Sequence, residues 1–211
     1  CNKAMASARG DYLLLLNNDT LVHPGALEAL LSTFEDHESA GAVCAQLRCQ
    51  DGSLQEAGGI VWRDGSAWNW GRGEDPRDPR FSYTREVDYG SAAALMVERA
   101  LWERIGGFDE SFAPAYYEDT DFCFSVRTES RRVVYQPKAV VTHLEGISHG
   151  TDTSAGMKSH QMTNQGRFAE KWRTALDGHR PNGVDPMLER DRGARVRILW
   201  VEACMLTPDQ D

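Results

Sequence analysis

The chain lacks a long apolar run and an excess of basic charge. Its 211 residues contain no stretch of about 18 apolar side chains, so the sequence predicts no transmembrane helix. No basic segment followed by an apolar segment opens the chain, so we also expect no signal peptide. The net charge of −9 argues against a general nucleic-acid-binding face. We therefore expect a cytoplasmic protein, either free or at the inner face of a membrane.

Cysteine is scarce and its spacing excludes two further classes. The cysteines are odd in number, and no two of them form a Cys-x-x-Cys pair: Cys1, Cys44, Cys49, Cys123 and Cys204. This pattern argues against a disulfide framework and against a zinc ribbon. Buried, reduced thiols are the simplest interpretation. The sequence also has no internal repeat, which excludes a repeat architecture.

The apolar runs that remain predict an α/β domain. Tyr12–Leu16 contains four consecutive leucines, a pattern typical of a strand that is buried on both faces. Gly41–Leu47 predicts a second strand. Between them, apolar residues at helical spacing after Pro24 predict an amphipathic helix that ends near His37. Strands that alternate with helices are typical of an open sheet covered by helices.

The first candidate site follows the leucine strand, at Asn17-Asn18-Asp19. Polar residues after a strand often form only a turn, because Asn and Asp side chains bond their own backbone. Open α/β folds, however, bind ligands at the carboxyl edge of the sheet. A carboxylate at this place is well located to hold a divalent cation, and an acidic protein needs such a cation to accept a phosphorylated ligand.

The second candidate site is the acidic cluster Glu118-Asp119-Thr120-Asp121. Acids at a helix N-terminus favour the helix dipole and cap free N–H groups, and this structural role explains one or two of them. The cluster contains three acids, which is more than capping and the helix dipole require. Because neighbouring carboxylates repel, the pKa of one of them rises, and that residue then suits general-base chemistry.

A third candidate is His143, which follows the predicted strand Ala139–Thr142. A histidine at a strand end is commonly a plain surface residue. It would form a Mn²⁺ ligand pair with Asp19 if both strands run parallel in one sheet. The predicted strand Val87–Val97 is rich in small residues, including Gly90 and Ser91, which let a ligand or another backbone approach.

The segment from Ala57 to Tyr89 is rich in glycine and arginine and carries three tryptophans. Asp64-Gly65 predicts a hairpin turn, and two prolines near position 77 predict a long surface loop. Trp62, Trp68 and Trp70 either stack on a ligand or form the hairpin core. The residues alone favour neither interpretation.

Taken in order, these segments resemble family 2 glycosyltransferases of the GT-A fold. The resemblance covers about Cys1 to Trp172. Its motifs are Ala8-x-Gly10-Asp11-Tyr12-Leu13, Leu16-Asn17-Asn18-Asp19-Thr20, Asp51-Gly52-Ser53-Leu54-Gln55-x-Ala57-Gly58, Leu95-Met96-Val97, Ile105-Gly106-Gly107-Phe108-Asp109-Glu110, Glu118-Asp119-Thr120-Asp121, Val133-x-Tyr135-x-Pro137, His143, Asn164, Phe168 and Lys171-Trp172. The resemblance implies an α/β, GT-A-like fold with a mixed, mainly parallel sheet flanked by helices, lacking its first strands.

The resemblance also implies a donor site. Asp19 would hold Mn²⁺ or Mg²⁺ at the diphosphate of a nucleotide-sugar, and His143 would complete the metal site. Asn17 and Asn18, together with Gly90 and Ser91, would bind the donor beside it.

An acceptor site follows from the same resemblance. Asp119 would be the general base that deprotonates a saccharide hydroxyl, Asp121 would be the alternative base, and Glu118 would accompany them. The metal would neutralise the leaving nucleoside diphosphate, and one in-line displacement would invert the anomeric centre.

Two other classes of function fit the residues. A metal-dependent nucleotide-sugar hydrolase or nucleotidyltransferase would release sugar 1-phosphate. A non-catalytic sugar-binding module would bind glycans without any effect of metal.

The resemblance and the composition together suggest boundaries. We expect a partial glycosyltransferase domain at 1–176, a linker at 177–195 and a tail at 196–211. The apolar run Val196–Val201 of this tail would either pack on the exposed sheet or a second copy, or form the first strand of a following domain. At about 30 residues per βαβ unit, roughly 60 or more residues of a complete domain would precede Cys1, and we expect weak or no donor binding and little activity without them. The exposed sheet edge or the tail would then favour a homodimer.

Overall fold

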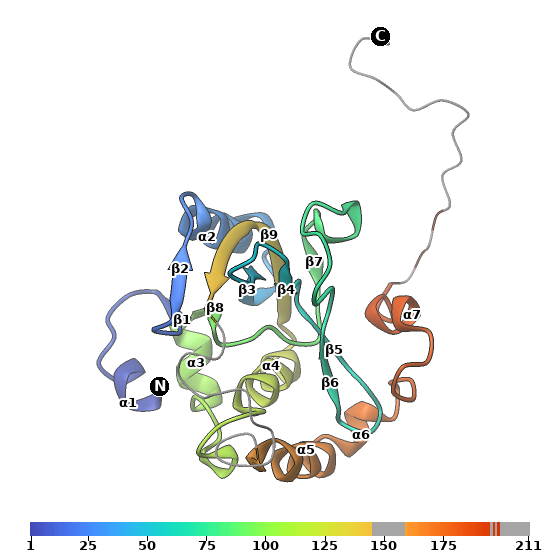
Figure 1. Cartoon of the computed structure of the whole chain (residues 1–211). Helices are drawn as coiled ribbons and strands as arrows, with labels where there is room; N and C mark the ends of the chain where they lie inside the picture. The colour runs from blue at the N-terminus through green and yellow to red at the C-terminus, as the bar shows by residue number, and fades with distance from the viewer. Residues whose placement is uncertain (145–158, 195, 197, 199–211) are drawn as a thin grey trace, which may run out of the picture.

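The computed structural model describes residues 1–144, 159–194, 196 and 198. A seven-stranded sheet forms its centre, with helices on both faces (Figure 1). Five strands follow the order β1-β8-β3-β9-β2, where β1 is Tyr12–Leu16, β8 is Ala94–Glu98, β3 is Ala40–Arg48, β9 is Arg132–His143 and β2 is Thr20–Val22. Two short strands extend it: β4 (Leu54–Glu56) pairs with β3, and β7 (Arg85–Glu86) pairs with β9.

Helices cover the two faces of this sheet with separate apolar cores. On one face, α2 (Ala26–Asp36) packs its Leu30 and Phe34 against β3, β8 and β9. On the other face lie α3 (Arg99–Ile105) and α4 (Glu118–Thr128), as Figure 1 shows. Because both faces are covered, the central strand β3 is buried along nearly its whole length. The remaining helices are α1 (Asn2–Met5), α5 (Ser159–Lys171), α6 (Arg173–Leu176) and α7 (Pro186–Arg190), and the short 3₁₀ turns are Pro79–Phe81 and Glu110–Phe112.

The strand directions correct one expectation. The sheet is mixed, as expected, but among the described strands only β3 and β9 pair in parallel, and every other pairing is antiparallel. The expected mainly parallel sheet is therefore wrong. An apolar run shows that a strand is buried, but it carries no information about the direction in which that strand crosses the sheet.

The leucine strand β1 also differs from expectation. It lies at one end of the described sheet and pairs with β8 alone. Leu13 and Leu15 are buried, but Tyr12 and Leu16 are 38% and 43% exposed. The strand is therefore half-buried rather than buried on both faces.

Two further boundaries differ from the sequence prediction. The strand expected at Val87–Val97 begins only at Ala94, and residues 87–93 mostly form a bent segment. Pro137 does not divide β9 into two strands, because the register with β3 shifts instead. Ala45 of β3 pairs with Gln136, and Gln46 pairs with Val140, so residues 137–139 form a bulge.

The tryptophan segment forms a small hairpin of β5 (Gly59–Val61) and β6 (Ala67–Asn69). The predicted turn at Asp64-Gly65 is confirmed, with Gly65 at φ 76°. Trp62 is fully buried and Trp70 nearly so, whereas Trp68 is 41% exposed. Burial excludes Trp62 from stacking on a ligand, so the hairpin-core interpretation holds for it.

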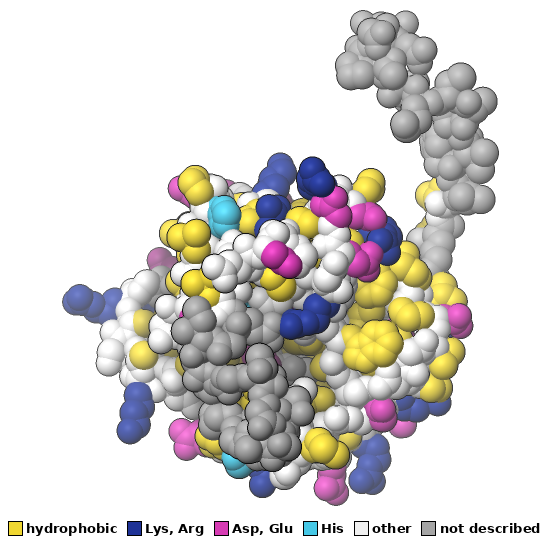
Figure 2. Space-filling model, in the orientation of Figure 1, with side chains coloured by type: hydrophobic (Ala, Val, Ile, Leu, Met, Phe, Trp, Pro, Cys, Tyr) yellow, Lys and Arg dark blue, Asp and Glu magenta, His cyan; other side chains and the backbone are white. Residues whose placement is uncertain are grey.

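The segment 177–192 packs against this hairpin, although its composition predicts a linker. Arg63 donates hydrogen bonds to the carbonyls of His179 and Arg180, and both His179 and Glu189 are buried. Figure 2 shows hydrophobic side chains on the same side of the molecule, where Figure 1 places β5, β6 and α7. The exposed apolar residues of these elements and of the loop before α7 are Trp68, Val184, Met187 and Leu188. The strand expected at 196–201 lies largely outside the described residues.

Candidate active site

The Asp19–His143 pair forms at the edge of the sheet where β1 ends. The carboxylate Oδ1 of Asp19 lies 3.1 Å from Nε2 of His143, and both side chains are largely buried. Asp19 and His143 therefore lie close together, but the expected cause, two parallel strands that end at the same edge, is wrong. The two residues meet because β2 turns back along β9 in antiparallel register, with Thr20 opposite His143.

Neighbouring amides orient this pair. Asn17 Nδ2 lies 3.3 Å from His143 Nε2, and Gln55 Nε2 lies 3.0 Å from His143 Nδ1. With Gln55 donating to Nδ1, the ring proton sits on Nε2 and points to Asp19. A half-turn of the Gln55 amide places its oxygen on an Nδ1–H instead, which frees Nε2 to bind a cation. Gln55 Oε1 is buried without a hydrogen-bond partner among the described residues, so this second arrangement gives that atom a partner.

The pair fits a divalent cation of the Mg²⁺ or Mn²⁺ type. Two neighbouring ligands of an octahedral ion at about 2.1 Å from the metal lie roughly 3.0 Å apart, close to the 3.1 Å between Asp19 Oδ1 and His143 Nε2. A carboxylate and an imidazole are donors that Mn²⁺ accepts. The exposed Asn17 and Asn18 lie in the same turn and leave the site open toward solvent.

The second cluster begins at the N-terminus of α4. Asp119 accepts hydrogen bonds from the backbone N–H of Ala92 at 3.1 Å and of Thr120 at 2.7 Å. Burial of the carboxyl raises the pKa of Asp119 despite these donors. Burial and the charge of Asp119 raise the pKa of Glu118 to about 7. Both residues remain partly exposed, so a ligand can reach them.

Asp121 has a different environment, although it lies in the same turn of helix. Its carboxylate pairs with Lys171 Nζ at 2.8 Å and accepts a hydrogen bond from Trp172 Nε1 at 2.7 Å. Asp121 is 2% exposed. Two residues along a helix are separated by roughly 200°, so Asp121 faces α5 and α6 while Asp119 faces Ala92. The geometry assigns Asp121 to the packing of α4, and Asp119 is the acid that a substrate can approach.

The bent segment at residues 90–93 connects the two clusters. Asn17 N–H donates to the carbonyl of Ala93 at 3.1 Å, while the N–H of Ala92 holds Asp119. Gly90 has no room for a side chain, since an added Cβ would lie 2.1 Å from Cβ of Cys44. The N–H of Ser91 donates to Glu56 at 2.9 Å. Gly90 and Ser91 therefore shape the wall between the clusters.

The sequence motifs did not single out Glu56. It occupies the unspecified position of the motif Gln55-x-Ala57 on β4, and it is fully buried. Burial raises the pKa of its carboxyl to about 8. The available signal was a single carboxylate within the otherwise apolar and small-residue run around Gly58.

Asn164 of α5 orients the chain that enters α4. Its Nδ2 donates to the carbonyls of Phe112, Ala115 and Tyr116 at 2.7, 2.9 and 2.9 Å. Tyr116 and Tyr117 both have a φ of 73°, a left-handed conformation that costs energy for a tyrosine. The buried amide of Asn164 stabilises this turn, which places Glu118 and Asp119 at the start of the helix.

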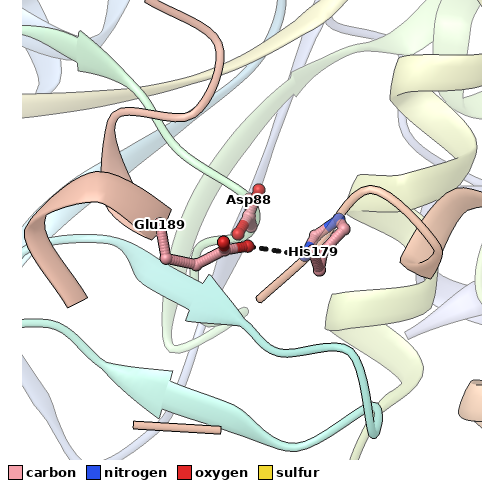
Figure 3. Close-up of side chains that lie close together, drawn as sticks. All are labelled: Asp88, His179 and Glu189. Atoms are coloured by element: carbon pink, nitrogen blue, oxygen red, sulfur yellow. Dashed lines mark ion pairs between the residues drawn. The ribbon is translucent and has the colours of Figure 1, made fainter. Parts of the chain in front are cut away.

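A third acidic group lies apart from these clusters. Asp88, His179 and Glu189 are the one group of three or more such residues, among those described, whose His, Cys, Asp or Glu ligand atoms all lie within 4.8 Å of each other (Figure 3). Arg192 pairs with Asp88 and with Glu189, the latter at 2.9 Å, and Arg127 pairs with Asp88 at 3.2 Å.

Two guanidinium groups therefore balance the two carboxylates of this set. Burial alone would raise the pKa of Asp88, but its hydrogen bonds and ion pair with Arg192 lower it below the usual value. His179 Nδ1 lies 2.6 Å from the carbonyl of Val61 and 3.1 Å from Glu189. We interpret the set as an ion-pair cluster that holds residues 177–192 on the hairpin.

The fold is similar to that of a solved protein structure. The solved structure of GalNAc-T7 with UDP, GalNAc and Mn²⁺ superposes with a TM-score of 0.61 at 13% identity, over 83% of this chain and 34% of that chain. At this identity the likeness shows the fold, which is that of the GT-A glycosyltransferases.

The family follows from the sequence comparison. The model of "Glycosyltransferase like family 2" matches residues 1–165, and the chain belongs to this family. Relatives include the N-acetylglucosaminyl-diphospho-decaprenol L-rhamnosyltransferase of Mycobacterium tuberculosis, 28% identical over 79% of this chain and 59% of the relative. The O-antigen biosynthesis protein RfbC of Myxococcus xanthus is 32% identical over 72% of this chain and 12% of the relative. The chain thus spans less than two thirds of the length of each of these relatives. No helix within the described residues is long and apolar enough to cross a membrane.

Proposed function

We propose that this chain carries the metal site and the base of a glycosyltransferase that moves a sugar from a nucleotide-sugar to a saccharide hydroxyl. The observation that carries the proposal is the adjacency of two unlike sites. Asn17, which lies beside the Asp19–His143 pair, bonds Ala93, and the preceding residue Ala92 bonds Asp119. A donor diphosphate and an acceptor hydroxyl need such neighbouring but distinct sites.

Asp119 is the general base in this proposal. Its raised pKa increases its affinity for the proton of a hydroxyl, and the N–H groups of Ala92 and Thr120 fix its orientation. Attack from the side of Asp119, opposite the leaving group, would invert the anomeric centre. Glu118 gives the site a second proton-exchanging group with a pKa of about 7.

Asp19 and His143 would hold Mn²⁺ or Mg²⁺, with Asn17 and Asn18 near the diphosphate. The cation would neutralise the charge that develops on the leaving nucleoside diphosphate. The protein itself is acidic, with a net charge of −9, so a cation would reduce its overall repulsion of a diphosphate. This acidic balance favours metal-assisted donor binding.

The relatives suggest where to look for substrates. One relative is named as an L-rhamnosyltransferase that acts on an N-acetylglucosaminyl-diphospho-decaprenol, and another as an O-antigen biosynthesis protein. We therefore infer a role in the assembly of a bacterial-type surface polysaccharide. A nucleotide-activated L-rhamnose belongs in the first set of donors to test.

The test is a panel of nucleotide-sugars with saccharide acceptors, in the presence of Mn²⁺ or Mg²⁺ or with EDTA. We expect metal-dependent release of nucleoside diphosphate together with a new glycoside. Asp119→Asn should retain donor binding and lower turnover at least 100-fold, the range of general-base catalysis. Asp36→Asn, on the exposed end of α2, is the matched control.

Three results would refute the proposal. Release of sugar 1-phosphate would point to hydrolase or nucleotidyltransferase chemistry. Glycan binding that does not respond to metal, without turnover, would indicate a sugar-binding module. Full activity of Asp119→Asn would exclude this residue as the base.

A further inference from the structure

Glu56 is a buried carboxyl group that the proposed reaction does not yet use. It lies on β4 with no exposed surface. Its Oε1 accepts the N–H of Ser91 at 2.9 Å, while its Oε2 is buried and has no hydrogen-bond partner among the described residues. A buried carboxylate oxygen without a donor is costly, whereas a protonated oxygen is neutral and can itself donate.

Asp119 is anchored next to Glu56. The two carboxyls accept hydrogen bonds from consecutive backbone N–H groups, Glu56 from Ser91 and Asp119 from Ala92. The charge of Asp119 adds to the cost of ionising Glu56, since Glu56 is fully buried. The titratable and charged groups around Glu56 are Asp119 and Cys123 of α4, Cys44 of β3, Tyr89 and Arg72.

We propose that Glu56 is a positioning residue that is a neutral carboxylic acid in the folded protein and so leaves the adjacent Asp119 as the ionised base. The role in the reaction rests on the proposed function, but the protonation of Glu56 does not. Glu56 acts through the Ser91–Ala92 segment. It accepts the N–H of Ser91, and Asp119 accepts the N–H of Ala92. It need not touch the substrate.

The chemistry of the two acids supports this division. Burial, partly offset by the Ser91 N–H, raises the pKa of Glu56 to about 8. Asp119 has three donors, the N–H groups of Ala92 and Thr120 and the Thr120 hydroxyl, so its anion is the better stabilised of the two. When one proton is shared between such a pair, it resides on the group with fewer donors.

The first test follows the protonation itself and needs no activity. Carboxyl ¹³C shifts of the full chain are recorded from pH 4 to 9, and the Glu56 signal is identified by its absence in Glu56→Gln. We expect one glutamate signal to titrate near pH 8. A Glu56 signal that titrates below about pH 5, the range of ordinary glutamates, would overturn the proposal.

A second measurement uses stability. Because the folded-state pKa of Glu56 lies above its unfolded value, the folded state binds the extra proton, and stability falls as pH rises between about 4.5 and 8. The unfolding constant of the wild type should therefore rise by up to about tenfold per pH unit relative to Glu56→Gln. Glu35→Gln removes an exposed carboxyl on α2, and the pH dependence of its stability should parallel that of the wild type. Parallel curves for Glu56→Gln and the wild type would refute the inference.

The role in catalysis is tested by a pair of variants. Glu56→Gln keeps an acceptor for the Ser91 N–H and mimics the neutral acid, so its kcat at pH 7 should stay within about threefold of the wild-type value. The wild-type kcat should change near pH 8, where Glu56 ionises, and this change should be absent in Glu56→Gln. Glu56→Leu lacks the acceptor and should lower kcat at least tenfold with little change in KM. Equal pH profiles for wild type and Glu56→Gln would show that Glu56 does not act through Asp119. If the wild type shows no turnover, the proposed function fails, while the titration still decides the state of Glu56.

Discussion

Removal of the Arg192 guanidinium should test how residues 177–192 are held on the domain. Its side chain makes a two-pronged pair with Asp88, one prong at 3.0 Å, and reaches Glu189 at 2.9 Å. Only 21% of the Arg192 side chain is exposed, and Glu189 is fully buried. Arg192→Ala would therefore leave two buried carboxylates with reduced compensation.

The expected cost follows from what remains around those carboxylates. Breaking a buried ion pair costs about 3–5 kcal/mol. Asp88 keeps Arg127 and the N–H of Val61, and Glu189 keeps the N–H of Arg180. These partners reduce the expected loss of unfolding free energy to about 2–3 kcal/mol. For a chain of this size that corresponds to a Tm lowered by about 5–10 °C.

The assay is urea and thermal unfolding, with hydrogen exchange at Arg63 and Arg180 to locate the change. The matched control is Arg173→Ala, because Arg173 pairs with Glu170 at 3.7 Å with both side chains at least 75% exposed. Such an exposed pair contributes about 0–0.5 kcal/mol. A loss below about 1 kcal/mol in Arg192→Ala would refute the ion-pair interpretation. A clear rise of the wild-type Tm with Zn²⁺ would instead assign Asp88, His179 and Glu189 to a metal.

Three further predictions concern the candidate site. Asn164→Leu leaves three carbonyls without their donor and should cost about 2–4 kcal/mol in urea unfolding; a neutral effect would show that the turn before α4 is stable without it. Gly90→Ala places a Cβ 2.1 Å from Cβ of Cys44 and should lower the free energy of unfolding by about 1–3 kcal/mol, so unchanged stability would mean that the backbone at Gly90 can shift without cost. Mn²⁺ should raise the Tm of the wild type and of the control His37→Ala, but not of His143→Ala; an equal response in all three would place the metal elsewhere.

Local patterns in the sequence predict most of the elements. Apolar runs and punctuating residues give β3, α2 and the Asp64-Gly65 turn close to their observed places. The direction of the strands is not predictable in this way, because burial and direction are independent. The positions of Asp19 after β1 and of His143 at the end of β9 predicted their contact, but not its cause. Asp19 lies in the turn before β2, and the antiparallel pairing of β2 with β9 brings the two residues together.

Long-range contacts explain the rest. The segment 177–195 is predicted to be a linker because it is polar, yet Arg192 in this segment pairs with Asp88, which lies about 100 residues earlier in the chain. A local reading cannot assign such partners. The same holds for Glu56, because its neighbours along the chain do not indicate that Ser91 and Asp119 will lie beside it.

The bulge at residues 137–139 sets the phase of the last part of β9. Side chains alternate between the two faces of a strand, yet Val134 and Val141, an odd number of residues apart, both pack in the core under α2 with their β3 partners Val43 and Leu47, so the bulge shifts the alternation along β9. The loss of one residue from the bulge would turn His143 away from Asp19 without altering either of them. The spacing around Pro137 is therefore as much a determinant of the metal-ligand geometry as the ligands themselves, and length changes there should be tolerated far less than substitutions.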